Sequence, residues 1–379
     1  MKKHNFPKTS QWKFALFLFL TTVFGLLLDS NLVSADTGLT PYVLSSGVKS
    51  DMDKERIYNI SSDGKELIRL NVPQNGAVKI RIAAASSNFV IVEVYKKENA
   101  SDLPHYLKTD CTSDLWNTGF VIDYFDKGTY YLRLPENDYK LGIVEYLSKN
   151  DTLKTGTTIA AYCDYEHENT YSFKAPGNGY IMLTKTSMET TDGTMTAVLC
   201  NNKETQLTEK SIFSLTQNNK VIYAVKKGIT YKVKMKALNL NDIQCYQLNL
   251  KFVNLSEKSG STKKKAVSVS FGNKVSGTVF AEDSATKADW YKIKNPKKQQ
   301  LLLNYSGSIT SGSLMMDVYD AKGKKLDSYS VISNIGEEKE DLMHNAGGGT
   351  KMPAGTYYLR VTKSRKSSTG IYSFSLSGK

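Results

Sequence analysis

A glycine turn followed by an alternating strand occurs three times along the chain, at intervals of about a hundred residues. The copies occupy residues 126–134, 226–235 and 353–361. After each turn every second residue is apolar: Tyr130, Leu132 and Leu134; Tyr231, Val233 and Met235; Tyr357, Leu359 and Val361. A cation separates the last two apolar positions each time (Arg133, Lys234, Arg360). Period-two alternation predicts a half-buried strand, and the recurrence predicts one domain-sized β-module present three times.

A second pattern supports the repeat independently. Residues 70–76 and 173–179 both end in a Pro-x-Asn-Gly turn, and an alternating strand follows each one. Proline presets φ in such turns, and we expect Asn-Gly to accept positive φ. The third copy keeps Pro296 but lacks the Asn-Gly.

These patterns predict three β-modules, at residues 36–148, 149–257 and 265–379. The Ser-, Gly- and Lys-rich residues 258–264 between the last two modules predict a flexible linker. No long stretch of helical periodicity follows Asp36, so the sequence predicts an all-β protein.

Residues 1–35 have the layout of a secretory signal peptide. Four lysines precede an apolar or neutral run at 14–28, and Val33-Ser34-Ala35 supplies small residues before a cleavage site at Asp36. The run is short for a bilayer span, which needs about 20 residues, although an uncleaved signal anchor is the alternative. We therefore expect a secreted, extracellular protein, either soluble or held to a surface non-covalently.

The third module carries four motifs in order: Ala288–Ile293, Leu314–Gly323, Pro353–Val361 and Gly370–Leu376. Over about residues 268–378 this series resembles the bacterial pre-peptidase C-terminal (PPC) domain, which is related to the collagen-binding domains of clostridial collagenases. The first two modules connect to that family only through the repeat, because they lack a clear Asp-Trp-Tyr start. The resemblance implies jelly-roll-like β-sandwiches, so the expected fold is a tandem array of three such modules after a signal peptide. Fold alone does not dictate function.

The same resemblance raises the question of structural calcium. The collagenase-type relatives bind Ca²⁺ through carboxylates near the start of the sandwich, and this ion prefers several oxygen ligands. Glu282, Asp283 and Asp289 lie in the corresponding stretch of this chain. Solvated loop carboxylates are the alternative, and no other cofactor is expected.

Residues with catalytic potential are few and dispersed. The three histidines after the leader, His105, His167 and His344, fall in separate modules, and no zinc or nucleophile-elbow motif accompanies them. Cys163 and His167 lie close in sequence, yet a loop with a partly buried thiol is the simpler interpretation. Cys163 and Cys200 are candidates for a disulfide within the second module, against free buried thiols. We expect no enzymatic activity.

Charge is concentrated in the third module. Residues 36–257 hold 26 Lys/Arg against 26 Asp/Glu, whereas residues 258–379 hold 20 against 10, a net +10. The candidate basic surface consists of Lys263, Lys264, Lys265, Lys297, Lys298, Lys322, Lys324, Lys325, Lys363, Arg365 and Lys366. Attraction to an anionic polymer is the functional interpretation and solubility is the alternative. Tyr131 and Tyr358, predicted on outer strand faces, would add aromatic contact area.

Together these features predict a secreted, non-catalytic binding protein. Its expected partners are an anionic cell-wall or mucosal glycan, or a host extracellular protein such as collagen or an immunoglobulin. The third module would hold the protein to an anionic polymer, without sequence-specific nucleic-acid binding and without a membrane span after signal cleavage. An accessory or targeting subunit of a secreted peptidase is the alternative that the resemblance suggests, and a hydrolase with an unrecognised site is a further one.

Overall fold

The computed structural model describes residues 43–45, 56–86, 89–147, 151–190, 194–213, 219–240, 242–256, 258–332, 335–344 and 349–379. The signal-peptide prediction for residues 1–35 lies outside these ranges. Within them, no helix is long and apolar enough to cross a membrane. Apart from one short 3₁₀ turn, the secondary-structure elements of these ranges are β-strands, which confirms the predicted fold class.

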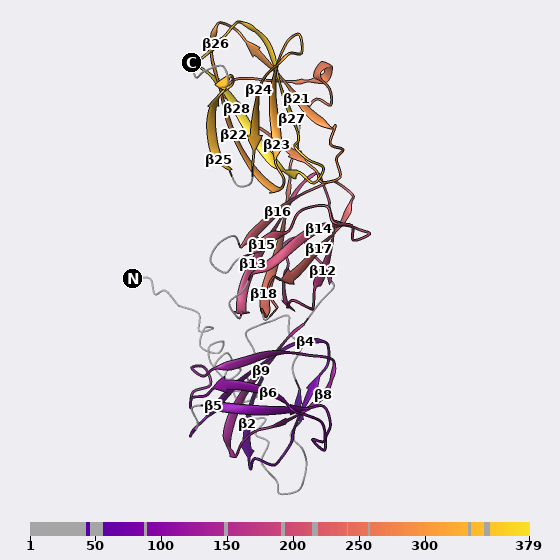
Figure 1. Cartoon of the computed structure of the whole chain (residues 1–379), viewed down its shortest axis with the longest axis vertical. Coiled ribbons are helices and arrows are strands. Elements are labelled where there is room, and N and C mark those ends of the chain that lie inside the picture. Colours follow the sequence, from indigo (N-terminus) through magenta and orange to yellow (C-terminus); the bar gives the residue numbers. More distant parts are fainter. Residues whose placement is uncertain are drawn as a thin grey trace, which may run out of the picture. The chain divides into compact units, whose positions relative to one another are not determined.

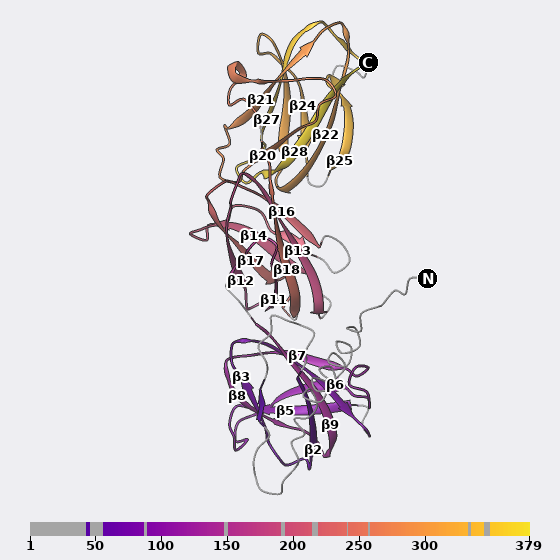
Figure 2. The same ribbon diagram turned by 180° about the vertical axis from the view of Figure 1, so that it is seen from behind.

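The chain forms three two-sheet sandwiches, whose paired layers are visible in Figures 1 and 2. In the first sandwich, one sheet has the strand order β1 (Val43–Ser45), β3 (Ile68–Val72), β8 (Gly128–Arg133), β5 (Phe89–Tyr95), β6 (His105–Asp110). The other sheet has the order β2 (Arg56–Ser62), β9 (Asn137–Leu147), β4 (Gly76–Ala84), β7 (Phe120–Phe125). In the second sandwich, one sheet has the order β10 (Asp151–Thr152), β12 (Asn169–Lys174), β17 (Thr230–Ala237), β14 (Met195–Asn201), β15 (Ser211–Phe213). The other sheet has the order β11 (Thr158–Cys163), β18 (Gln244–Asn254), β13 (Gly179–Thr190), β16 (Lys220–Val225). In the third sandwich, one sheet has the order β19 (Val267–Val269), β21 (Ala288–Asn295), β27 (Gly355–Lys363), β23 (Leu314–Asp320), β24 (Lys325–Val331). The other sheet has the order β20 (Val275–Val279), β28 (Thr369–Gly378), β22 (Gln299–Ser311), β25 (Ile335–Asp341), and β26 (Lys351–Met352) pairs with β22.

Strand order is the same in all three sandwiches. β3, β12 and β21 occupy equivalent places, as do β8, β17 and β27, which carry the repeated alternating pattern. In each copy the short first strand pairs in parallel with its neighbour, whereas the other pairs are antiparallel. The first sandwich belongs to one compact unit of the chain, and the second and third together form the other.

Each sandwich encloses its own apolar core between its two sheets. All nine apolar residues of the repeated pattern are buried, as the alternation predicts. The first buried tyrosine of each strand also closes the preceding turn. The Tyr130 hydroxyl donates to Asp126 O, Tyr357 donates to Pro353 O (3.0 Å each), and the Tyr231 hydroxyl accepts from Lys226 N at 2.9 Å.

The two Pro-x-Asn-Gly turns use their asparagine differently from the prediction. Neither Asn75 nor Asn178 has a positive φ. Their side-chain oxygens instead accept the backbone N–H of Lys127 and Lys227, at 2.8 Å in both modules, so the two repeated motifs bind each other across the sandwich. The glycine is needed for close packing, because a Cβ on Gly179 would lie 2.0 Å from Val253 O.

The second and third sandwiches share a buried polar triad. Tyr291 and Tyr372 join hydroxyls at 2.7 Å, and Tyr372 also donates to Asp289 at 3.0 Å. At the equivalent places Tyr171 and Tyr246 are 2.8 Å apart, and Asn169 donates to Tyr246 at 2.8 Å. The second module therefore does have a counterpart of the Asp-Trp-Tyr start, in the form Asn169-Thr170-Tyr171.

The disulfide between Cys163 and Cys200 is not formed; both are buried thiols. Cys163 points into the core between the sheets. Cys200 pairs in register with Lys232 on β17 and points to the opposite, outer side of its sheet. Because a disulfide needs facing Cβ atoms about 4 Å apart, this arrangement rules out the predicted pairing.

The predicted linker is held against the third module. Gly260 exchanges two backbone hydrogen bonds with Trp290, at 2.8 and 3.0 Å, and the Ser259 hydroxyl donates to Asp289 at 3.0 Å. Lys263–Lys265 forms one turn of 3₁₀-helix, η1. The Lys263 ammonium donates to Ala321 O at 2.9 Å, so η1 lies beside the β23–β24 turn.

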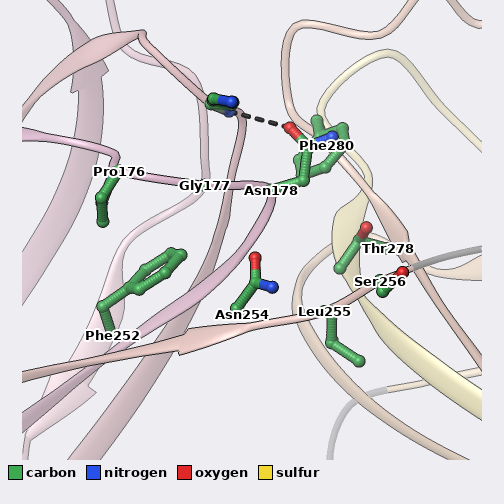
Figure 3. Close-up of a pocket in the computed structure, with 10 residues that line it drawn as sticks. Pro176, Gly177, Asn178, Phe252, Asn254, Leu255, Ser256, Thr278 and Phe280 are labelled. Atoms are coloured by element: carbon green, nitrogen blue, oxygen red, sulfur yellow. Dashed lines mark hydrogen bonds between the residues drawn. The ribbon is translucent and has the colours of Figure 1, made fainter.

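The second and third modules also contact each other directly. Arg365 pairs with Glu209 at 2.8 Å, and the Thr310 hydroxyl donates to Ile222 O. A groove of about 550 Å³ lies at the Asn178 turn, and Figure 3 shows the residues that line it. It is lined by Pro176, Gly177, Asn178, Lys227, Phe252, Asn254, Leu255, Ser256, Thr278 and Phe280, of which only Lys227 is charged.

Candidate functional site

The outer face of the five-stranded sheet in the third module gathers aromatic and cationic side chains. Cross-strand register aligns two rows on this face. One row runs Trp290, Arg360, Asp317 across β21, β27 and β23, and the next runs Lys292, Tyr358, Tyr319. Side chains opposite each other on one face lie about 5 Å apart and interact. These six residues define what we call the aromatic–cationic face.

The rings and cations of this face contact one another. The Trp290 and Tyr319 rings are 5.4 Å apart between centroids. The Arg360 guanidinium lies 5.7 Å from the Trp290 ring centre, and the Lys263 ammonium lies 4.7 Å from that of Tyr358. Cation–π contacts of this kind hold the cations over the rings while leaving the rest of each charge accessible.

One carboxylate limits the charge of the face. Asp317 is buried, 2.5 Å from the Lys325 ammonium and 3.9 Å from the Arg360 guanidinium. The Arg360 Nε has no hydrogen-bond partner within the described part of the chain. With Lys292 in the next row, the face keeps a surplus of donors over acceptors, which is the chemistry that an anionic ligand needs.

Most of the predicted basic residues lie at one end of this sandwich. β21 and β23 end where β27 begins, since Asn295 pairs with Gly355 and Asp320 with Tyr357. Exposed lysines follow both strand ends: Lys297 and Lys298 after β21, and Lys322, Lys324 and Lys325 after β23. Lys263 joins η1, with Lys264 and Lys265, to the β23–β24 turn. The structure therefore brings eight of the predicted cations together at the end of β21 and β23.

The other three predicted cations lie elsewhere. Lys363 is buried, donates to Ala281 O at 2.8 Å and to Lys366 O at 3.1 Å, and burial lowers its pKa. Its assignment to the basic surface is therefore wrong, because its ammonium caps backbone carbonyls. Arg365 serves the contact with Glu209 in the second module, and Lys366 follows at the same end of β27.

The proposed calcium ligands contact protein groups instead of converging. Asp283 binds Lys287 at 2.8 Å and lies 3.9 Å from Lys226. Burial, and then the neighbouring Glu282 carboxylate, raise the pKa of the Tyr231 hydroxyl. Both residues thus contact the second module. Asp289 belongs to the tyrosine triad. Nowhere in the described ranges do three or more His, Cys, Asp or Glu side chains form a metal-sized group.

The histidines lie in separate acid–base pairs. His105 contacts Asp123, His344 lies 3.3 Å from Asp327, and His167 lies 2.8 Å from Asp164. Cys163 is close to His167 in sequence but buried in the core, and burial raises the pKa of its thiol to about 12. A thiol in that state is a poor nucleophile.

Sequence reasoning found Tyr358 but missed Trp290, Tyr319 and Lys292. Tyr131 occupies the place of Tyr358 in the first module and is partly exposed there, opposite Tyr95. Trp290 and Lys292 alternate with the buried Tyr291 and Ile293, so their outward direction could have been read from parity. Their approach to Arg360 and Tyr319 depends on strand register, which no local pattern reveals.

No protein-family model matches the chain, and no curated protein does. Among solved structures, the pre-peptidase C-terminal domain of collagenase from Bacillus anthracis is similar over 33% of this chain and 100% of that one, with 12% identity and a TM-score of 0.23. The secreted serine protease VesC from Vibrio cholerae matches 78% of this chain and 74% of its own, with 11% identity and a TM-score of 0.22. A CBM22 tandem domain of Paenibacillus barcinonensis Xyn10C matches 55% and 82%, with 8% identity and a TM-score of 0.16. Likenesses at this level assign no function to the chain.

Proposed function

We propose that this chain is a secreted, non-catalytic binding protein whose third module binds an acidic extracellular polysaccharide. The ligand would lie across the aromatic–cationic face, with sugar rings against Trp290, Tyr319 and Tyr358. Its carboxylate or sulfate groups would pair with Arg360 and Lys292. The lysines at the adjoining end of the sandwich would extend the contact along the polymer.

The observation that carries this proposal is the cross-strand alignment of Trp290 with Arg360 and of Tyr358 with Lys292. Flat rings supply contact area at low entropic cost, and guanidinium groups bind carboxylate or sulfate oxygens in a bidentate manner. Long-range attraction comes from the third module, whose residues 258–379 hold 20 Lys/Arg against 10 Asp/Glu.

Binding of the chain to immobilised chondroitin sulfate, with dextran as the neutral control, tests the proposal. The protein should be retained on immobilised chondroitin sulfate and should not be retained on dextran. Retention should weaken as salt rises, since exposed charges are screened over about 8–10 Å at physiological ionic strength. Trp290→Ala and Arg360→Ala should each weaken binding by about tenfold or more, which corresponds to about 1.4 kcal/mol.

The matched control is Lys234→Ala, which removes the cation at the same position of the second module. It should leave the affinity unchanged. Equal binding by the parent protein and Trp290→Ala would contradict the proposal, as would equal retention on dextran. Binding to collagen or immunoglobulin but not to chondroitin sulfate would replace the polysaccharide by a protein ligand.

A further inference from the structure

A lysine lies inside the core of the second module. Lys185 on β13 is 2% exposed and follows the inward-facing Ile181 and Leu183. Its ammonium nitrogen lies 2.9 Å from the side-chain oxygen of Gln244 on β18, and Gln244 is completely buried. The described residues provide Lys185 with no carboxylate partner. Burying a charged ammonium group against a neutral amide alone is costly.

The other two sandwiches show that the fold does not require this pair. Ile82 stands at the same distance from Gly76 as Lys185 does from Gly179, and Tyr305 faces Phe374 as Lys185 faces Leu248. Gln244 lies two residues before Tyr246, and the residues two before the corresponding Tyr139 and Tyr372 are Asn137 and Gly370. At the place of Lys185 the other modules have an isoleucine or a tyrosine, and at the place of Gln244 they have an asparagine or a glycine. Only the second module therefore combines a lysine with a glutamine at these two positions.

The contact places a nucleophile beside an acyl group. Because the Gln244 Cδ–Oε1 bond is about 1.2 Å long, the Lys185 nitrogen lies at most about 4 Å from Cδ, close to the distance of a near-attack arrangement. Burial lowers the pKa of Lys185, which favours the neutral, nucleophilic amine. The Gln244 Nε2 has no hydrogen-bond partner within the described ranges, so nothing there holds the leaving group.

We propose that Lys185 and Gln244 form an intramolecular isopeptide bond that joins β13 to β18 covalently. The Lys185 nitrogen attacks Gln244 Cδ, the new N–C bond forms, and the Cδ–Nε2 bond breaks. One proton passes from the lysine nitrogen to the departing Nε2, which leaves as ammonia. No oxidant, reductant or cofactor is needed, and the product buries a neutral amide in place of a charge.

Cys163 is the competing nucleophile. It is the register partner of Gln244 on β11, so a thioester between them would release the same ammonia. Burial raises the pKa of Cys163 to about 12, which keeps it as a thiol, whereas Lys185 is favoured as an amine. The 2.9 Å contact between the Lys185 nitrogen and Gln244 Oε1 favours the lysine as the nucleophile as well.

Intact-mass measurement of the purified full chain, denatured and reduced, tests the proposal. The mass should be lower than that calculated from the sequence by one ammonia, about 17 Da. Peptide fragmentation should find Lys185 and Gln244 in one branched peptide. A mass that equals the calculated one would overturn the proposal, and this readout does not depend on any variant folding.

Three variants locate the bond. Lys185→Arg should restore the calculated mass, because a guanidinium is not an acyl acceptor under these conditions. Lys79→Arg, at the buried lysine of the first module, should keep the deficit. Cys163→Ala should also keep it, and hydroxylamine should not remove it. A deficit that hydroxylamine removes and that Cys163→Ala lacks would assign the bond to a thioester and contradict the proposal.

Discussion

The second and third modules place a cation at the same point of the same sheet and surround it differently. In the second module Lys234 lies 3.1 Å from both Glu168 and Glu204, and Glu204 also binds Lys232 at 2.6 Å. In the third, Arg360 lies over Trp290 and donates to the Tyr319 hydroxyl at 3.4 Å. The first module combines the two arrangements: Arg133 binds Glu93 at 3.1 Å and also lies 5.1 Å from the centre of the Tyr95 ring.

This difference separates a scaffold from a site. The sandwich needs an alternating strand with a polar outer row, and either arrangement satisfies that need. Carboxylates in close contact with the cation neutralise it in the second module. In the third module Asp317 binds Lys325 at 2.5 Å and lies 3.9 Å from Arg360, so more of the Arg360 charge is available to a ligand. The comparison teaches that the repeated pattern determines the fold, and that the outer neighbours of the repeated cation determine whether a module can bind an anion.

The largest expected effect separates the inner and outer rows of β27. Tyr357→Ala should lower the free energy of unfolding by about 3–5 kcal/mol, because its ring is buried in the core. Tyr358→Ala, on the outer row, should cost less than about 1 kcal/mol. Chemical denaturation of both variants checks this. Equal losses would mean that the strand is not half-buried and that the outer row is not free for ligands.

The next effect concerns the buried triad. Tyr372→Phe removes the hydroxyl that donates to Asp289, and Tyr246→Phe removes the one that accepts from Asn169. We expect a loss of about 1–3 kcal/mol for the first and about 1 kcal/mol for the second, because hydrogen bonds to carboxylates are stronger. Thermal denaturation should rank them in that order. The reverse order would contradict a stronger hydrogen bond to Asp289 than to Asn169.

These triads also show what the sequence could and could not predict. Alternation correctly predicted the buried faces of β8, β17 and β27, since parity is a local property. Other contacts join residues far apart in the sequence. Asp289 and Tyr372 of the triad are 83 positions apart, Asn75 and Lys127 are 52 apart, and Lys185 and Gln244 are 59 apart. Such contacts depend on strand register. Lys363 was misassigned for the same reason, because its partner Ala281 O comes from a distant loop.

A smaller effect is expected when the outer carboxylates of the second module are removed. Glu168→Gln with Glu204→Gln frees Lys234 and Lys232, yet no tryptophan lies beside them in the cross-strand register of β17. Exposed ion pairs contribute about 0–1 kcal/mol, so stability should change little. Affinity for chondroitin sulfate should rise less than about threefold, or about 0.6 kcal/mol. If the second module of the double variant bound chondroitin sulfate as tightly as the third module does, charge alone, without aromatic rings, would be enough to make the site.

The smallest expected effect is the contribution of Asp164, in the second module, to the pH dependence of stability. Burial opposes ionisation of Asp164, but hydrogen bonds from Tyr162, His167 and the N–H groups of Glu166 and His167 hold its pKa below the ordinary 3.8. A lowered folded-state pKa contributes stability above pH 3.8 that is lost as the pH falls through the folded value. Asp164→Asn should therefore flatten the acid limb of the unfolding curve below about pH 4. An unchanged acid limb would exclude this contribution.

The central claim is that the third module alone presents a ligand face, and tryptophan footprinting tests it most directly. Within the described chain, Trp290 lies on the aromatic–cationic face and Trp116 lies exposed in the first module. Hydroxyl-radical oxidation of both residues should be measured with and without chondroitin sulfate. We predict that the polymer protects Trp290 and leaves Trp116 unchanged, and that high salt abolishes the protection. Protection of Trp116 with none at Trp290 would contradict the account.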